Sequence, residues 1–115
     1  MKATIFHNPR CSNSRRALEL LNEAGAEVTV IEYLKTPPSA EELRRIYDRA
    51  GISAREGLRA KESLAADLDL LSGRVSDSEI LAAMVANPIL IERPLVETDK
   101  GALVARPPER VKNIL

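Results

Sequence analysis

The residues that could carry chemistry gather in one stretch of this 115-residue chain, between residues 7 and 16. His7 and Cys11 are its only histidine and its only cysteine, and Arg10, Arg15 and Arg16 surround the thiol. The thiolate is the nucleophilic form of cysteine, and neighbouring positive charge lowers the pKa of a thiol. A lone cysteine can also be a small buried apolar side chain, but the polar neighbours of Cys11 favour a nucleophile.

This stretch lies where a strand gives way to a helix. Residues 3–6 are apolar and predict a buried strand, and apolar side chains at helical spacing predict a helix over about residues 12–24. A helix start presents unpaired backbone N–H groups and the positive end of the helix dipole. We therefore expect an oxyanion to bind beside Cys11, next to serine and asparagine side chains that would also suit helix capping.

His7 admits two interpretations. An imidazolium four residues before Cys11 would lower the pKa of the thiol. A histidine at the end of a strand can equally be held in place by a hydrogen bond, and the sequence leaves both interpretations open. A metal site is not expected, because one histidine and one cysteine cannot supply the usual four ligands.

Three arginines outside this stretch are further candidates. Arg93 follows an apolar segment and precedes Pro94, an unusual place for a charge unless its side chain points into a cleft. Arg59 follows an apolar residue, and Arg106 ends the last predicted strand. Each of them could be a solvated surface charge, and the pattern alone does not bring the three together.

The order of the predicted elements indicates an α/β protein with a thioredoxin- or glutaredoxin-like layout. A β-branched run at residues 28–33 completes a strand–helix–strand unit, whose two strands should be parallel. Two Ser-x-x-Glu capping boxes, at residues 39–42 and 76–79, open helices in the middle third. Residues 95–98 and 103–105 flank a glycine-bearing turn and predict a hairpin, which a short helix at residues 109–115 follows. We expect a single domain, residues 1–115, with a four-stranded mixed sheet and a helical insert at about residues 39–87.

Charge and cysteine content narrow the function classes. The formal net charge is zero, so no basic excess indicates a nucleic-acid partner. No apolar run reaches the roughly 18 residues of a membrane helix, so no membrane association is expected. One cysteine cannot form an intrachain disulfide, which fits a reducing, cytoplasmic location. If Cys11 is oxidised during turnover, the reducing thiol must come from another molecule.

Five short motifs stand in order along the chain. Residues 7–15 resemble H-N-P-x-C-x-x-S-R, residues 33–38 resemble Y-L-x-T-P-P, and residues 58–62 resemble L-R-x-K-E. Residues 88–96 resemble P-I-L-I-x-R-P-I-V, and residues 106–109 resemble a closing R-P-x-E. Together the five motifs resemble those of the glutaredoxin-linked arsenate reductases, the ArsC family, and the resemblance covers essentially the whole chain.

The resemblance implies a thioredoxin-like fold, no bound cofactor, and reduction of arsenate to arsenite with glutathione as co-substrate and glutaredoxin as partner. Cys11 would attack arsenate and form a covalent adduct, Ser14 would belong to the anion-binding loop, and His7 would help to lower the pKa of Cys11. A cis peptide is implied before Pro94. Forked guanidinium donors suit an oxyanion such as arsenate. The arginines that would bind it are Arg59, Arg93 and Arg106.

The sequence leaves two alternatives to arsenate reduction open. One is a thiol-dependent reductase that uses glutathione on another substrate. The other is a regulatory or interaction protein similar to the Spx transcription regulators, which bind RNA polymerase. Spx-like proteins often carry Cys-x-x-Cys, whereas Ser14 takes the second position here, which weakens that alternative. The three retained arginines favour the enzyme.

Overall fold

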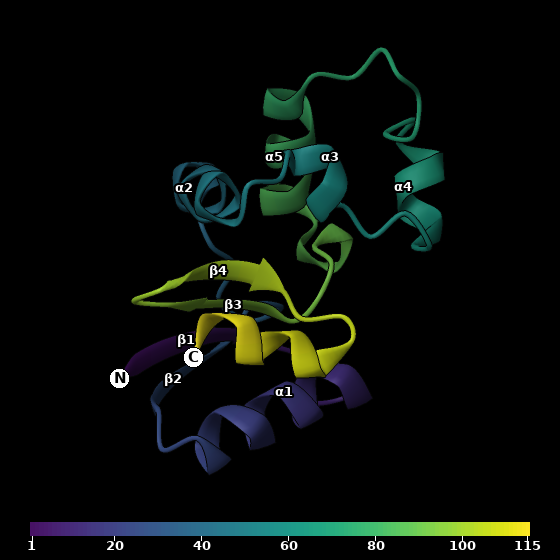
Figure 1. Ribbon diagram of the computed structural model, residues 1–115. Coiled ribbons are helices and arrows are strands. Elements are labelled where there is room, and N and C mark those ends of the chain that lie inside the picture. The colour runs from purple at the N-terminus through teal and green to yellow at the C-terminus, as the bar shows by residue number, and fades with distance from the viewer. The chain divides into compact units, whose positions relative to one another are not determined.

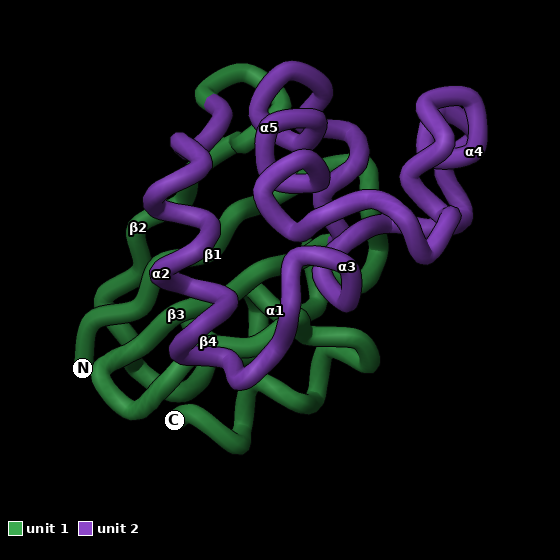
Figure 2. The backbone as a smooth tube through the Cα atoms, turned by 90° about the horizontal axis from the view of Figure 1, so that it is seen from above, with its two compact units in different colours: residues 1–36, 93–115 green, residues 37–92 purple.

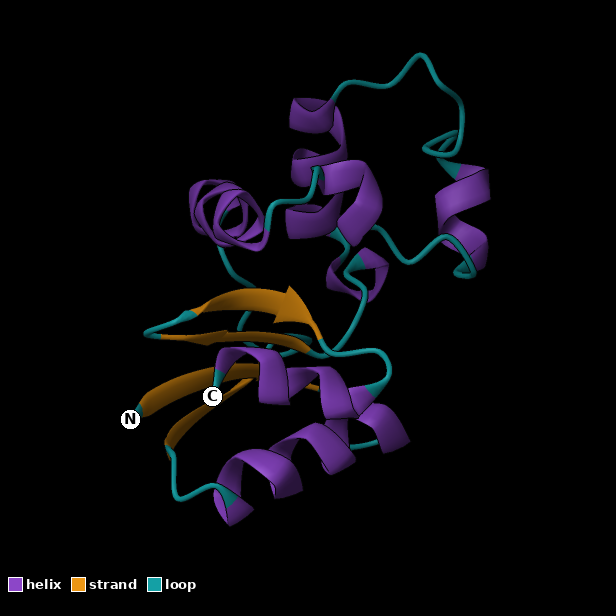
Figure 3. Ribbon diagram, viewed as in Figure 1, coloured by secondary structure: helices purple, strands orange, loops and turns teal.

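The computed structural model describes residues 1–115 and divides the chain into two compact units. Residues 1–36 and 93–115 form the first unit, and residues 37–92 form the second (Figure 2). The first unit holds all of the strands, and the second is built of helices and loops (Figure 3). The insert expected at about residues 39–87 falls within the second unit, and the assignment of the whole chain to one domain stays a prediction. None of the helices combines the length and the apolar character needed to cross a membrane.

Four strands form one mixed sheet in the first unit. The strand β1 (Lys2–His7) pairs in parallel with β2 (Glu27–Glu32) and antiparallel with β3 (Leu95–Thr98). The strand β3 in turn pairs antiparallel with β4 (Gly101–Val104), so that the order is β2-β1-β3-β4. The predicted sheet, with one parallel pair beside a hairpin, is therefore confirmed. Its central strand β1 leads directly into the loop that carries Cys11.

Two helices cover the same face of this sheet (Figure 1). They are the α-helix α1 (Ser12–Glu23) and the 3-10 helix η2 (Pro108–Ile114), and they also contact each other. Removing apolar side chains from water is the main stabilising contribution in such a layer. The buried core that the strands and both helices share consists of Ala3, Ile5, Ala17, Leu20, Leu21, Val96, Leu103, Ala105, Val111 and Ile114.

The two ends of α1 follow from the local sequence. Cys11 takes the N-cap position with an extended backbone, which turns the chain from the strand into the helix. Gly25 follows the C-cap residue with a φ of 76°, in the left-handed region that favours glycine. The helix is thereby held on the sheet with its first turn at the carboxyl end of β1.

The second unit is built from short helices. Ser39 and Ser76 each accept a hydrogen bond from the backbone N–H three residues later, at 3.1 and 3.2 Å, as the capping boxes predict. Ser53 and Glu56 form a complete capping box that the sequence analysis had not identified. The helices are α2 (Ala40–Ala50), α3 (Ala54–Gly57), α4 (Ser63–Asp67), α5 (Asp77–Ala86) and the 3-10 helix η1 (Pro88–Leu90).

Candidate active site

The loop between β1 and α1 is shaped by its own hydrogen bonds. Oδ1 of Asn8 accepts from the backbone N–H of Arg10 at 3.0 Å, and the backbone N–H of Cys11 donates to the Asn8 carbonyl at 3.0 Å. Arg15 reaches back and donates from Nη1 to the Pro9 carbonyl at 2.8 Å. Asn8 therefore organises the loop, although the sequence analysis had not singled it out. An asparagine followed by proline is a turn signal that could have identified it.

Ser14 links the loop to the end of the strand. It is fully buried, and its hydroxyl oxygen accepts from the backbone N–H of Asn8 at 3.0 Å and lies 2.6 Å from Nδ1 of His7. A hydroxyl has one proton to donate, so this geometry fits donation from Ser14 to a neutral His7 ring. The side chain of Ser14 thus supports the loop, while its backbone N–H favours the Cys11 thiolate.

Two arginines that are distant in the sequence reach the Cys11 sulfur. Arg93 hydrogen-bonds the sulfur, and Nη1 of Arg106 lies 3.9 Å from Sγ and also donates to the Arg93 carbonyl at 3.1 Å. The strand register explains this meeting, because Leu95 at the start of β3 pairs with Phe6 near the end of β1. The hairpin therefore brings the residues just before β3 and just after β4 to the loop that carries the thiol.

The surroundings of Cys11 favour its thiolate. Burial alone would raise the pKa of the thiol, but the Arg93 hydrogen bond and attraction from the backbone N–H groups of Ser14 and Asn13 outweigh burial. The pKa of Cys11 consequently lies below its ordinary value. The Cys11 residue is also partly exposed. A partly exposed thiol with a lowered pKa is suited to nucleophilic chemistry, and the guanidinium groups beside it are suited to an oxyanion.

His7 lies at the site in a setting that favours its neutral form. Burial lowers the pKa of His7, Glu32 opposes that shift, and Arg15 adds to it. An imidazolium is therefore disfavoured near neutral pH, in agreement with the interpretation of a histidine held by a hydrogen bond. The expected influence of His7 on the pKa of Cys11 stays a prediction, and the contact that could transmit it runs through Ser14.

Arg59 belongs to the second unit. Its Nη1 forms an ion pair with Oε1 of Glu92 at 2.8 Å, and both side chains are largely buried. The backbone N–H of Arg59 donates to the Leu90 carbonyl at 2.8 Å, and that of Glu92 donates to the Gly57 carbonyl at 2.9 Å. Arg59 is thus held firmly within its unit, and its expected role at the oxyanion beside the other two arginines stays a prediction.

The peptide bond between Arg93 and Pro94 is cis, which confirms the expectation drawn from the resemblance. A second cis bond, between Arg106 and Pro107, had not been predicted. Each of the two arginines that reach Cys11 is therefore followed by a proline in the cis conformation.

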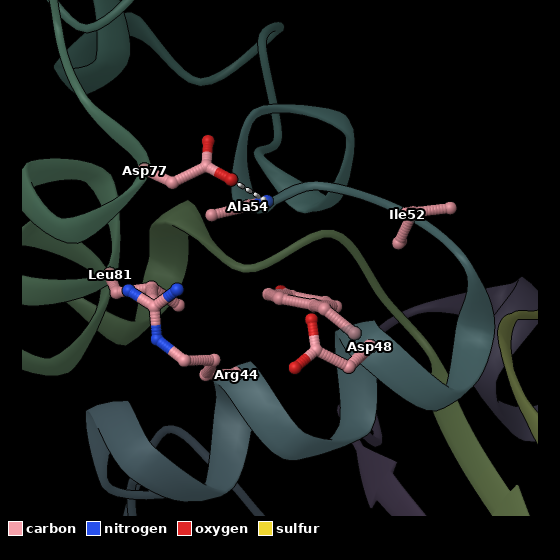
Figure 4. Close-up of a pocket in the computed structure, with 7 residues that line it drawn as sticks. Arg44, Asp48, Ile52, Ala54, Asp77 and Leu81 are labelled. Carbon is pink, nitrogen blue, oxygen red and sulfur yellow. Dashed lines mark hydrogen bonds between the residues drawn. The ribbon is translucent and has the colours of Figure 1, made fainter.

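A small pocket in the second unit is lined by charged side chains, two of which are hydrogen-bonded within the protein. Figure 4 shows Arg44 and Asp48 on α2, with Asp77 at the start of α5. Asp77 accepts from the backbone N–H of Ala54 at 3.3 Å, and Arg44 donates to Oγ of Ser78 at 3.1 Å. The cavity of about 20 Å³ is far smaller than the roughly 300 Å³ at which small-molecule sites begin. The Cys11 site is therefore the stronger candidate for chemistry.

The sequence as a whole decides the family. The sequence model of the ArsC family matches residues 6–114. The chain belongs to the ArsC family. The fold agrees, because an arsenate reductase structure from Vibrio cholerae superposes with a TM-score of 0.96 at 46% identity, over 100% of this chain and 98% of that chain. The thioredoxin-like fold and the family resemblance predicted from the five motifs are both confirmed.

Two relatives illustrate the range of names within the ArsC family. The arsenate reductase of Rhizobium meliloti (strain 1021) is 45% identical over 115 residues, which are 100% of this chain and 82% of that protein. The uncharacterized protein YfgD of Escherichia coli (strain K12) is 46% identical over 112 residues, which are 96% of this chain and 94% of that protein. Similar identity thus accompanies both a named reductase and a protein without a named activity.

The pKa of this ArsC protein's thiol can be measured by alkylation. The rate of reaction between Cys11 and iodoacetamide should rise with pH around a midpoint below the free-thiol value of about 8.5. Arg93→Ala should move the midpoint upward, because the substitution removes a hydrogen bond and a positive charge from beside the sulfur. Arg110→Ala is the control, since its exposed guanidinium donates to the Val104 carbonyl. An unshifted wild-type midpoint, or equal shifts in both variants, would contradict this account.

Ser14→Ala should lower the free energy of unfolding by about 1–3 kcal/mol, the usual cost of leaving a buried polar group without its partner. The substitution removes the acceptor of the Asn8 N–H and the partner of the His7 ring. Urea unfolding followed by circular dichroism measures the change. Ser12→Ala is the matched control, because Ser12 is exposed at the first helical position and should change stability by less than about 0.5 kcal/mol. Equal losses of unfolding free energy in the two variants would show that the buried hydrogen bonds of Ser14 do not account for its contribution to stability.

Proposed function

We propose that this ArsC-family protein reduces arsenate to arsenite with Cys11 as the nucleophile. One observation carries the proposal. Cys11 is partly exposed at the start of a helix, its thiol has a lowered pKa, and Arg93 and Arg106 reach its sulfur. A thiolate facing guanidinium groups can bind an oxyanion and attack its central atom in the same place. Relatives at 41–46% identity that carry the name arsenate reductase support arsenate as that oxyanion.

In the first step, the Cys11 thiolate attacks arsenic. A sulfur–arsenic bond forms, the bond between arsenic and one hydroxyl group breaks, and that hydroxyl leaves as water after taking up a proton. Arsenic stays in the +5 state, so this step is a substitution. Arg93 and Arg106 would hold the remaining oxygens and stabilise the negative charge that builds up on them. The role proposed for Arg59 is to complete this set of donors.

In the second step, the thiolate of glutathione attacks the sulfur of Cys11. A disulfide bond forms between Cys11 and glutathione, the sulfur–arsenic bond breaks, and its electron pair stays on arsenic. Arsenic is thereby reduced to the +3 state and leaves as arsenite. Cys11 is the only cysteine in the chain, so no internal thiol can replace glutathione in this step.

In the third step, glutaredoxin and a second glutathione reduce the mixed disulfide by thiol–disulfide exchange. The products are the Cys11 thiolate and oxidised glutathione, and the two electrons gained by arsenic equal those lost by the two glutathione thiols. We place this cycle in a reducing cytoplasm, because it consumes reduced thiols and depends on a free cysteine.

Arsenite release tests the proposal. The purified protein, arsenate, glutathione and glutaredoxin should together release arsenite over repeated turnovers. Leaving out the protein, arsenate or glutathione should abolish the release, and leaving out glutaredoxin should limit it to a single turnover. Arsenite production that persists with thioredoxin in place of glutathione and glutaredoxin would reject this choice of reductant. If the protein does not reduce arsenate but Cys11 still undergoes thiol–disulfide exchange, that result would favour the second candidate, a thiol-dependent reductase of another substrate. The relative YfgD, which carries no named activity, keeps that candidate relevant.

A further inference from the structure

We propose that Arg10 binds a carboxylate of the incoming glutathione and so makes Cys11 selective for anionic thiols. The inference rests on the proposed use of glutathione. It assigns to glutathione a binding group that lies outside the oxyanion site. Arg93 and Arg106 are directed at the sulfur and at the oxygens it would carry. The second thiol needs a docking group of its own.

The three arginines around the loop differ in what engages them. Arg16 forms ion pairs with Glu19 at 3.0 Å and Glu23 at 3.6 Å. Arg15 donates to the carbonyl of Pro9. The exposed side chain of Arg10, by contrast, forms no hydrogen bond or ion pair within its unit. It is therefore the arginine whose charge is available to a molecule arriving from solvent.

Arg10 is also held close to the reacting sulfur. Its backbone N–H donates to Oδ1 of Asn8, which fixes the residue within the turn. Adjacent Cα atoms lie about 3.8 Å apart, so the side chain starts beside that of Cys11. The groups that lower the pKa of Cys11 most are Arg93 and two backbone N–H groups. The guanidinium of Arg10 is not among the groups that stabilise the thiolate.

The chemistry of glutathione fits such a group. Glutathione carries two carboxylates and one ammonium group, so it approaches with a net negative charge. Attack on a sulfur proceeds opposite the bond that breaks, so the thiol must arrive from the side away from the bound arsenic. A free guanidinium beside Cys11 offers its positive charge and N–H donors to one of its carboxylates. At an exposed position, one such pair should change the rate about three- to fivefold.

Thiol–disulfide exchange tests the inference without arsenate. The Cys11 thiolate attacks oxidised glutathione, a disulfide between Cys11 and glutathione forms, and one glutathione thiolate leaves. Intact mass spectrometry at low salt gives the rate, and 2-hydroxyethyl disulfide serves as an uncharged counterpart. Arg10→Ala should slow the reaction with oxidised glutathione about three- to fivefold and leave the reaction with the uncharged disulfide unchanged. Arg10→Lys should recover most of the rate, because it keeps the charge.

Arg16→Ala is the matched control, because it removes the same charge from a guanidinium that glutamates already neutralise. Equal slowing in Arg16→Ala, equal slowing with the uncharged disulfide, or no slowing in Arg10→Ala would each overturn the inference. These outcomes do not depend on arsenate chemistry, so they are distinct from a failure of the proposed function. In the arsenite assay, Arg10→Ala should raise the KM for glutathione and leave the KM for arsenate unchanged.

Discussion

Replacing Cys11 with serine should reduce arsenite release by a factor on the order of a thousand or more. A serine hydroxyl at this position has no neighbouring base to ionise it, because His7 is engaged by Ser14 rather than by residue 11. The covalent intermediate would then not form, and no other thiol in the chain could replace it. The measurement is arsenite formed per enzyme molecule in the complete assay with glutathione and glutaredoxin.

The fold of the Cys11→Ser variant should be unchanged. The substituted residue is the N-cap of α1, a position at which serine is among the favoured residues. Circular dichroism and urea unfolding should therefore match the wild type to within about 0.5 kcal/mol. Retention of more than about a tenth of the wild-type activity by a folded variant would reject Cys11 as the nucleophile.

Arg93→Lys should lower kcat/KM for arsenate about 10- to 100-fold, although the charge is kept. A guanidinium offers two parallel N–H donors to neighbouring oxygens, whereas an ammonium is a point charge on a flexible stem. The loss corresponds to one charged hydrogen bond, about 1.5–3 kcal/mol. Steady-state kinetics with varied arsenate and saturating glutathione measure the effect.

Arg110→Lys is the control for Arg93→Lys, because it makes the same exchange at an exposed arginine that bonds a strand carbonyl. Arg106→Lys should resemble Arg93→Lys, since its guanidinium both approaches the sulfur and supports the Arg93 carbonyl. Full activity in Arg93→Lys would show that charge alone suffices and would contradict the proposed forked binding of the oxyanion.

Much of the first unit could be predicted because its signals are local. The run at residues 3–6, the helical spacing after Cys11 and the glycine-bearing turn at Gly101 each predict one element. The parallel arrangement of the first two strands then follows from the helix that joins them. Cys11 could be singled out for a similar reason, since a polar loop at a helix start changes the chemistry of a thiol.

The contacts within the site could not be predicted in the same way. That Arg93 and Arg106 meet at Cys11 depends on the strand register, which brings together residues about 80 to 95 positions apart. The neutral form of His7 depends on its burial and on its bond to Ser14, which no local pattern shows. Long-range pairing and burial are properties of the folded chain, so local patterns do not show them, and only the family resemblance had implied a shared role for the two arginines.

The most direct test of the account is the intact mass of the protein after incubation with glutathione, with and without arsenate, and without glutaredoxin. We expect one added glutathione on Cys11 in the presence of arsenate and none in its absence, because the sulfur must bind arsenic before glutathione attacks. Addition of glutaredoxin should remove the adduct and restore repeated turnover. An adduct that forms equally without arsenate, or no adduct at all from a protein whose Cys11 pKa is lowered, would contradict the proposed reduction of arsenate through Cys11.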